Sequence, residues 1–302
     1  MSSISKPIAF LILAHADPDQ LARLARALDY RSRIFIHLDA KSDLAEFRRR
    51  TFPSCASFLG NRVRVSWAAF SSVEAIICLM RAALSSGESY SHLVFLSGLD
   101  YPIKPMRKLH EFLNSAPQRE HICFTDASLS RHYPMFFEHY WFLETIPGLP
   151  RKFERNLRHG FGRALRPFLK KPQPSSMVPC WGSAYWALTP QCVNHILEFT
   201  DKRPDYVRWA RSSYAPDEHY FHTIVGNSSF LSASDGFIPC EGNKTYKMAN
   251  LHLIDPSLRK VRTEEDLREI LNSDKFFVRK LTSGQSKGLL DILDQDVLTA
   301  VQ

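Results

Sequence analysis

Ala9-Phe10-Leu11-Ile12-Leu13-Ala14-His15 is the first of several short apolar runs that alternate with helical patterns in the first half of the chain. Such alternation is typical of βαβ units, in which parallel strands share one sheet and helices cover its faces. The patterns predict strands at 8–14, 33–38, 62–66, 91–97 and 120–124, and helices at 17–29, 43–50, 71–86 and 105–115. Ser71 or Ser72 is expected to cap the third helix. We therefore predict an α/β fold with a mixed, mostly parallel central sheet.

Polar side chains stand where three of these strands end. His15 follows the first strand, Asp39 follows the second and Asp100 follows the fourth. In open α/β sheets, ligands bind beyond the carboxyl ends of the strands. These three residues are therefore expected in a binding site rather than in the core.

The second half of the chain is less regular. Residues 127–178 are rich in aromatic and basic side chains, and we interpret them as an insertion. The sheet pattern resumes at 182–188, and a helix is predicted over 190–199. Because no linker divides the chain, we predict a single domain over 1–281, followed by a C-terminal helix over 282–302.

Pro216-Asp217-Glu218 has the composition of a helix start. Proline fits the first helical position, and the two carboxylates would face the positive end of the helix dipole. One interpretation is a well-capped helix and nothing more. The other is a carboxylate base beside an aromatic strand, Cys180-Trp181-Gly182-Ser183-Ala184-Tyr185-Trp186, as a sugar enzyme would need.

Composition indicates a globular protein, with 44% hydrophobic and 23% charged residues. No run approaches the roughly 20 apolar residues of a membrane helix, and no signal-peptide pattern is found. The six cysteines lack CxxC spacing, which indicates a reducing compartment and no zinc site.

Many of the basic residues behind the net charge of +8 gather in 151–171, an amphipathic segment suited either to peripheral membrane contact or to covering a cleft. Because this segment carries no nucleic-acid-binding motif, no nucleic-acid partner is expected.

Several blocks occur in a characteristic order: Ala9–His15, Ile34–Ser42, Trp67–Ala75, His92–Lys104, Cys180–Leu188 and Tyr214–Phe221. With this order and spacing the chain resembles the core-2/I-branching β-1,6-N-acetylglucosaminyltransferase and peptide O-xylosyltransferase family, from about Ile8 to Lys280. The resemblance implies the GT-A nucleotide-sugar fold. It also implies an inverting, metal-independent transfer of a sugar, first of all GlcNAc, from a UDP-sugar to a hydroxyl of a glycan or glycolipid. UDP-xylose is the alternative donor, and a catalytically weak sugar-nucleotide or glycan-binding protein is the second alternative.

The resemblance also assigns the donor side of the site. Asp39 matches the aspartate that helps to hold the nucleoside, and Lys280 matches a lysine that contacts the diphosphate. His252 stands where the family has an arginine, and it lacks the permanent charge and forked geometry of arginine. Candidates to compensate are Lys247, Arg259 and Arg262. No metal and no cofactor are expected, because neither Asp39 nor Asp100 has the second carboxylate of an Asp-x-Asp motif.

On the acceptor side, Glu218 matches the general base, and Asp217 is its neighbouring carboxylate. Aromatic faces stack on sugars, and charged groups of the insertion can bind hydroxyls. The expected acceptor-binding residues are Trp67, Arg131, Glu138, Trp181, Tyr185 and Asp217. Alternation along a strand predicts that Tyr185 and Trp186 face opposite sides, with at least one of them in the core.

Animal members of the family usually carry an N-terminal membrane anchor. No such anchor is found here. We therefore expect a bacterial cytoplasmic enzyme, peripheral at the inner membrane surface through 151–171, or a chain from which an anchor has been removed.

Overall fold

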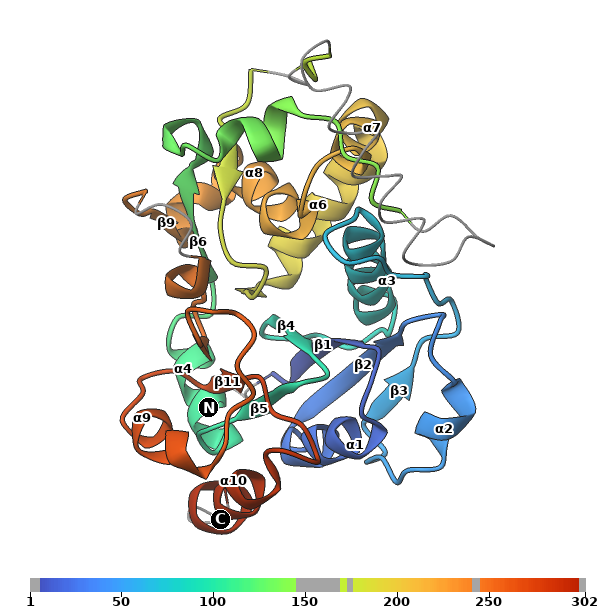
Figure 1. Ribbon diagram of the computed structural model, residues 1–302, viewed down its shortest axis with the longest axis vertical. Coiled ribbons are helices and arrows are strands. Elements are labelled where there is room, and N and C mark those ends of the chain that lie inside the picture. Colours follow the sequence, from blue (N-terminus) through green and yellow to red (C-terminus); the bar gives the residue numbers. More distant parts are fainter. Residues whose placement is uncertain (1–5, 145–168, 173–175, 241–244, 299–302) are drawn as a thin grey trace.

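The computed structural model describes residues 6–144, 169–172, 176–240 and 245–298 (Figure 1). Its main sheet contains β1 (Ile8–Ala14), β2 (Ser32–Leu38), β3 (Ala56–Phe58), β4 (Leu93–Ser97), β6 (Glu120–Asp126), β7 (Cys180–Trp181), β8 (Ala187–Leu188) and β9 (Ser234–Phe237). The strand order is β3-β2-β1-β4-β8-β6-β7, with β9 paired to β6. Strands β3, β2, β1 and β4 run parallel, whereas β8 is antiparallel to both of its neighbours. The predicted α/β fold with a mixed, mostly parallel sheet is confirmed.

The apolar run of β1 is continuous because both faces of this strand are buried. Ala9 and Leu11 point into the core on one side of the sheet. Phe10 and Ile12 point into the core on the other side. This central position fixes the carboxyl end of β1, and His15 after it, in the middle of the sheet edge.

Helices cover both faces of the sheet (Figure 1). They are α1 (Pro18–Ala27), α2 (Leu44–Arg48), α3 (Ser71–Leu84), α4 (Met106–Ser115), α6 (Pro190–Lys202), α7 (Pro204–Arg211), α8 (Tyr220–Gly226), α9 (Leu267–Leu271) and α10 (Lys287–Ile292). Helices α3, α6 and α8 supply the core on one face. Helices α1, α4 and α10 supply the core on the other. The helices predicted in the first half and at 190–199 are confirmed within a few residues.

The predicted cap of α3 is wrong. Its first residue, Ser71, donates its backbone N–H to Oε1 of Glu144 at 2.8 Å, and no side chain of the N-cap residue Phe70 takes part. The Ser71 hydroxyl instead accepts the Ser66 N–H at 2.9 Å. A carboxylate distant in sequence thus satisfies the helix start and its dipole.

The predicted strand at 62–66 is also wrong, because this segment is attached to the end of β2 largely by side chains. Val63 N–H donates to Nε2 of His37 at 2.8 Å, and the Arg62 guanidinium donates to the carbonyls of Leu38 at 3.0 Å and Asp39 at 2.7 Å. These bonds replace a strand ladder. The strand that pairs with β2 lies earlier, at β3.

Of the strand predicted at 182–188, only Ala187–Leu188 is formed, as β8, and β7 lies just before the predicted range. Gly182 follows β7 directly, and an added Cβ there would lie 2.5 Å from the Cys123 carbonyl oxygen and 2.7 Å from the His222 ring. Trp186 is buried in the core while Tyr185 is half-buried, so the prediction that at least one of them is a core residue is confirmed. The alternation itself does not hold, because neither residue belongs to a strand and both rings pack against Phe95.

The helix predicted from Pro216 begins later. Pro216–Glu218 is a single 3-10 turn, and α8 starts at Tyr220. His219 separates the two with φ −140° and ψ −23°, so Asp217 and Glu218 lie outside the α-helix. The two carboxylates are therefore held by a turn and by its contacts with β7.

A second, three-stranded sheet has the order β10-β11-β5, with β10 (His252–Ile254), β11 (Phe277–Arg279) and β5 (Asp100–Pro102). The chain is helical from Lys287 through Leu298, as α10 and a wider final turn. Arg23 of α1 binds Asp291 and Asp294 of this segment, each at 2.8 Å. Within the described ranges, no helix has both the length and the apolar character that crossing a membrane requires.

Candidate active site

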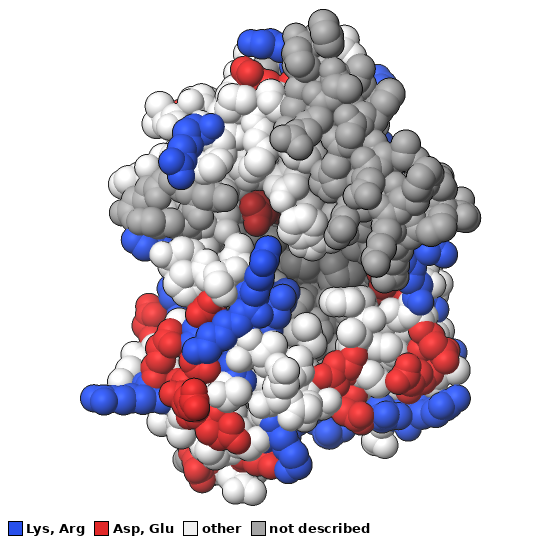
Figure 2. Space-filling model, in the orientation of Figure 1, with Lys and Arg blue, Asp and Glu red and all other residues white. Residues whose placement is uncertain are grey.

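A cavity of about 350 Å³ lies beyond the carboxyl ends of β1, β2 and β4. The polar and aromatic side chains in its lining are His15, Asp39, Lys41, Ser66, Trp67, Ser72, Phe95, Ser97, Tyr185, Asp217 and Arg279. Five of the predicted site residues are thus brought together. Figure 2 shows an acidic group recessed near the centre of the molecular face, with a cluster of basic side chains just below it.

Asp39 is fixed at the β2 end of the cavity. Its backbone N–H donates to the Ala14 carbonyl at 2.8 Å, and its carboxylate accepts the Lys41 N–H at 2.9 Å. The Lys41 ammonium lies 3.2 Å from the second carboxylate oxygen. Arg62 binds three carbonyls of this loop, those of Leu38, Asp39 and Ser42. The loop after β2 is thus held in shape before any ligand arrives.

The predicted base Glu218 is held from two sides. Its Oε2 accepts the Trp181 indole N–H at 3.1 Å, and its carbonyl accepts the Gly182 N–H at 2.9 Å. Burial, reinforced by the neighbouring Asp217, raises the pKa of Glu218 to about 8. Burial also raises the pKa of Asp217 to about 6. Such a pair holds a proton near neutral pH, and its carboxylate form is a stronger base than an ordinary glutamate.

Trp181 was predicted to stack on the acceptor, but it is only 1% exposed and packs on Phe136 with 5.3 Å between ring centroids. Its N–H orients Glu218 instead. Trp67, by contrast, is 83% exposed at the cavity and lies edge-on to Tyr214 at 6.0 Å. Of the two tryptophans, only Trp67 offers a free face to a sugar ring.

Asp100 and His252 were predicted to bind the donor, but the structure places both beneath the cavity. Asp100 is fully buried and accepts the Ser97 N–H at 2.6 Å. His252 is 2% exposed, with Nε2 at 3.3 Å from Asp100 and its ring between Tyr185 and Phe277. The position at which the family has an arginine is therefore occupied here by a core histidine.

Besides Lys41, the cavity is lined by a second cation, Arg279, to which the sequence reasoning assigned no role. Its Nη1 donates to Oδ1 of Asp100 at 2.9 Å, and its guanidinium lies 5.4 Å from the centre of the Tyr185 ring. Arg279 holds the pKa of Asp100 below its usual range despite burial, with help from His252. The available signal was the pair Arg279-Lys280, in which only the lysine was assigned.

Lys280 follows directly but does not line the cavity. Burial and the adjacent Arg279 lower its pKa. Its carbonyl accepts the Arg262 N–H at 2.9 Å, which anchors the segment after β11. Its role at the diphosphate stays a prediction.

Arg131 and Glu138 also lie outside the cavity lining. Arg131 is exposed and contacts His132, with 3.3 Å between Nε and Nε2. The Glu138 carbonyl accepts the Lys171 N–H at 2.9 Å. Much of the insertion, 145–168 and 173–175, lies outside the described residues, and so does most of the basic segment predicted to touch a membrane.

Residues 8–235 match the family described as "Core-2/I-Branching enzyme", and the chain belongs to that family. The resemblance seen in the sequence is thereby confirmed.

Two curated relatives illustrate the similarity. The rat β-1,3-galactosyl-O-glycosyl-glycoprotein β-1,6-N-acetylglucosaminyltransferase 3 is 25% identical over 241 residues, covering 77% of this chain and 50% of the relative. The human N-acetyllactosaminide β-1,6-N-acetylglucosaminyl-transferase is 24% identical over 224 residues, covering 72% and 52%. This chain thus spans about half the length of these relatives. Among solved structures, mouse xyloside xylosyltransferase 1 is 15% identical with a TM-score of 0.34, covering 78% of this chain and 86% of that one.

Proposed function

We propose that the chain transfers a sugar, GlcNAc in the first instance, from a UDP-sugar to a hydroxyl of a glycan or glycolipid, with inversion and without a metal. The observation that carries the proposal is that one cavity joins Asp39, Arg279 and Asp217, with Glu218 beside it in the same turn. GlcNAc is the first choice of donor sugar because the two relatives described above are named as N-acetylglucosaminyltransferases.

In this mechanism, Glu218 removes the proton of the acceptor hydroxyl as the oxygen attacks the anomeric carbon. The bond between that carbon and the diphosphate oxygen breaks on the opposite face, and UDP leaves. Negative charge grows on the leaving diphosphate, and the fixed guanidinium of Arg279 lies at the cavity to stabilise it. Lys280 is the second candidate cation.

Metal independence rests on this cation and on the sequence around the strand ends. Asp39 already accepts from Lys41 and Asp100 from Arg279, so each carboxylate has a protein cation as its partner. We expect transfer to continue in excess EDTA. Loss of activity in EDTA that manganese restores would contradict this part of the proposal.

The proposal is tested by measuring UDP release from UDP-GlcNAc and UDP-xylose. Acceptors would be a β-1,3-galactosyl glycan and N-acetyllactosamine, the groups in the names of the two relatives. UDP release from UDP-GlcNAc that depends on acceptor supports it, and faster release from UDP-xylose assigns the alternative donor. UDP binding without turnover of either donor would indicate a binding protein and overturn the proposal. Vesicle binding by the intact protein tests the membrane contact predicted for 151–171.

A further inference from the structure

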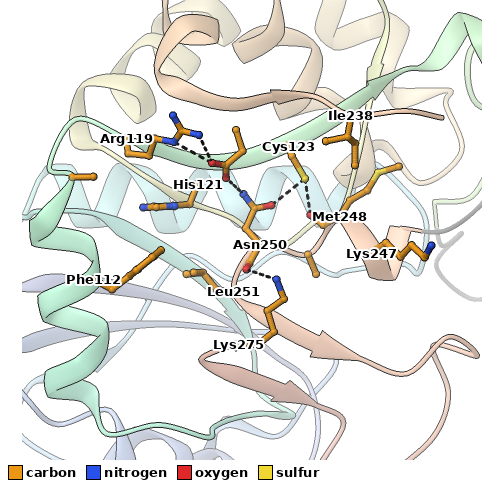
Figure 3. Close-up of a pocket in the computed structure, with 13 residues that line it drawn as sticks. Phe112, Arg119, His121, Cys123, Ile238, Lys247, Met248, Asn250, Leu251 and Lys275 are labelled. Atoms are coloured by element: carbon orange, nitrogen blue, oxygen red, sulfur yellow. Dashed lines mark hydrogen bonds and ion pairs between the residues drawn. The ribbon is translucent and has the colours of Figure 1, made fainter. Parts of the chain in front are cut away.

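Two cavities of the molecule have walls that are fixed in different ways. The larger one, about 640 Å³, lies beside β6 and β9 and shares no lining residue with the candidate active site (Figure 3). One of its walls is held by side chains that bind one another (Figure 3). Arg119 donates Nε to Oδ1 of Asp235 at 3.0 Å, and Asn250 donates to the other oxygen of Asp235. No residue of its lining has a left-handed backbone conformation.

At the candidate active site, by contrast, two alanines have a left-handed backbone. Ala68, which lines the cavity, has φ 59°. Ala215, which precedes the turn Pro216–Glu218, has φ 45° and ψ 56°. This conformation is strained for a residue with a Cβ, because the Cβ approaches the following carbonyl oxygen. Such a residue persists only where its surroundings hold it, and residues of this kind are concentrated at functional sites.

The two alanines hold each other by a backbone hydrogen bond. The Ala215 N–H donates to the Ala68 carbonyl at 2.9 Å, and the Ala215 carbonyl accepts the Glu218 N–H at 3.0 Å. The residues that precede the alanines also meet, since the rings of Trp67 and Tyr214 lie edge-on with 6.0 Å between their centroids. The loop before α3 is therefore joined to the turn of Glu218, although the two segments are far apart in the sequence.

The pair of alanines lies between two groups that one acceptor sugar would contact at the same time. Trp67, directly before Ala68, is 83% exposed at the cavity. Glu218, bonded to Ala215, is the candidate base. A sugar that packs on the Trp67 ring presents its hydroxyl to Glu218 only if ring and carboxylate keep a fixed distance and angle. Transfer depends on such alignment of the reacting groups.

We propose that Ala68 and Ala215 are positioning residues, and that their left-handed pair fixes the Trp67 ring relative to the Glu218 carboxylate. The acceptor sugar packs on the ring while its reacting hydroxyl faces the base. The pair acts through these two residues, and its effect on the acceptor rests on the proposed function. Its effect on the ring of Trp67 is independent of any activity.

The first test measures the ring of Trp67 directly. The chain contains five tryptophans, so labelling with fluorotryptophan gives five fluorine NMR signals, and Trp67→Phe identifies the signal of Trp67. Ala68→Gly and Ala215→Gly free the backbone, because glycine populates other conformations as readily. Each variant should shift or broaden the Trp67 signal. An unchanged Trp67 signal in both variants overturns the proposal.

Arg31→Gly is the matched control. Arg31 is exposed and also left-handed, with φ 45°, but it precedes β2 at the edge of the sheet opposite the cavity. The same chemical change there should leave the Trp67 signal, the turnover and the UDP affinity as in the wild type.

The second test measures acceptor-dependent UDP release. Both alanine variants should lower kcat/KM for the acceptor by about tenfold or more, because a small misplacement of reacting groups can cost about 10²-fold. Their UDP affinity should stay within about twofold of the wild type. Stability in chemical unfolding should not fall, because glycine relieves the strain. A purely structural role predicts the reverse, lower stability with unchanged kcat/KM, and that result overturns the proposal.

The double variant tests whether the two alanines act as a pair. Because they bind each other, the combined loss in kcat/KM should be close to the larger of the two single losses. Losses that multiply would show that the alanines act separately and would overturn the pairing. A wild type without acceptor-dependent UDP release would refute the proposed function, and the fluorine signals alone would then decide the role of the pair.

Discussion

Two carboxylate sites in this molecule, the fully buried Asp100 and the half-buried pair Asp217 and Glu218, have opposite electrostatics. Asp100 is fully buried, yet its pKa is lowered, because Arg279, His252 and the Ser97 N–H all contact it. Asp217 and Glu218 have raised pKa values, because burial acts on two adjacent acids. Glu218 accepts the Trp181 N–H, and no ion pair joins either acid to a cation among the residues that the structure describes. A carboxylate thus binds and orients a cation at Asp100, whereas at Glu218 a carboxylate can accept a proton. The partner, rather than the depth of burial, decides the role.

Removing the proton acceptor, Glu218, should have the largest effect on turnover. Glu218→Gln should reduce turnover by roughly 10²–10⁴-fold, the usual contribution of a positioned base. The fold should be retained, because glutamine resembles the protonated form that a pKa of about 8 favours at pH 7. Turnover and UDP affinity are measured together, with Glu111→Gln on the exposed face of α4 as the control. Near-native turnover would transfer the role of base to Asp217.

Removing the cation that binds Asp100, Arg279, should have the next largest effect on kcat. Arg279→Gln should lower kcat by about 10²–10³-fold, as when a stabilising donor is lost from a transition state. The free energy of unfolding should also fall, because Asp100 is left buried without its cation. Arg279→Lys keeps the charge and serves as the variant that folds if the first does not. Arg107→Gln, an exposed arginine on α4, is the control; equal kcat for Arg279→Gln and the wild type would remove Arg279 from the mechanism.

Removing the charge of one of the two adjacent acids should shift the pH profile of kcat/KM. Transfer requires ionised Glu218, so kcat/KM should rise with pH up to about 8 in the wild type. Asp217→Asn removes the neighbouring negative charge, and the rising limb should move down by about one pH unit. It should not reach the value of a free glutamate, because burial is the larger cause. Asp205→Asn on α7 is the control, and an unmoved limb would show that the acids do not interact.

The smallest effect on ligand binding is expected at His252. Because it contacts Asp100 and not the cavity, His252→Gln should change UDP affinity by less than about twofold, while stability falls by about 1 kcal/mol. Calorimetry with UDP and chemical unfolding measure the two quantities. A large loss of UDP affinity with unchanged stability would place His252 at the diphosphate after all.

The fold was predictable because strand burial and helix periodicity are local signals. The apolar run of β1 and the spacing along α3 each identify an element without knowledge of the rest. The strand at 62–66 failed because Arg62 and His37 make bonds that depend on the folded loop. The start of α3 at Ser71 was predicted correctly, but its cap was not, since Glu144, which accepts the Ser71 N–H, lies 73 positions away in sequence.

The candidate site was predictable where residues follow a strand directly, as His15 and Asp39 do. It was not predictable where one side chain determines the role of another. Asp100 follows the same rule of position, but Arg279, 179 positions later, makes it an internal counterion. Trp181 and Tyr185 belong to one aromatic motif, yet only Tyr185 lines the cavity. The sequence predicts which polar residues follow a strand, but it does not predict which side chains contact each other in the folded protein.

The pairing of Asp100 with Arg279 has a consequence for synthesis on the ribosome. Strand β5 is made early, whereas its partner β11 is complete only when Arg279 has been added, 179 residues after Asp100. Until then Asp100 has no guanidinium beside it, and an ionised carboxylate without a partner is strongly disfavoured in an apolar interior. We therefore expect the β4–β5 turn of the growing chain to stay hydrated, and the cavity to take its final form only after β11 has emerged and paired with β5.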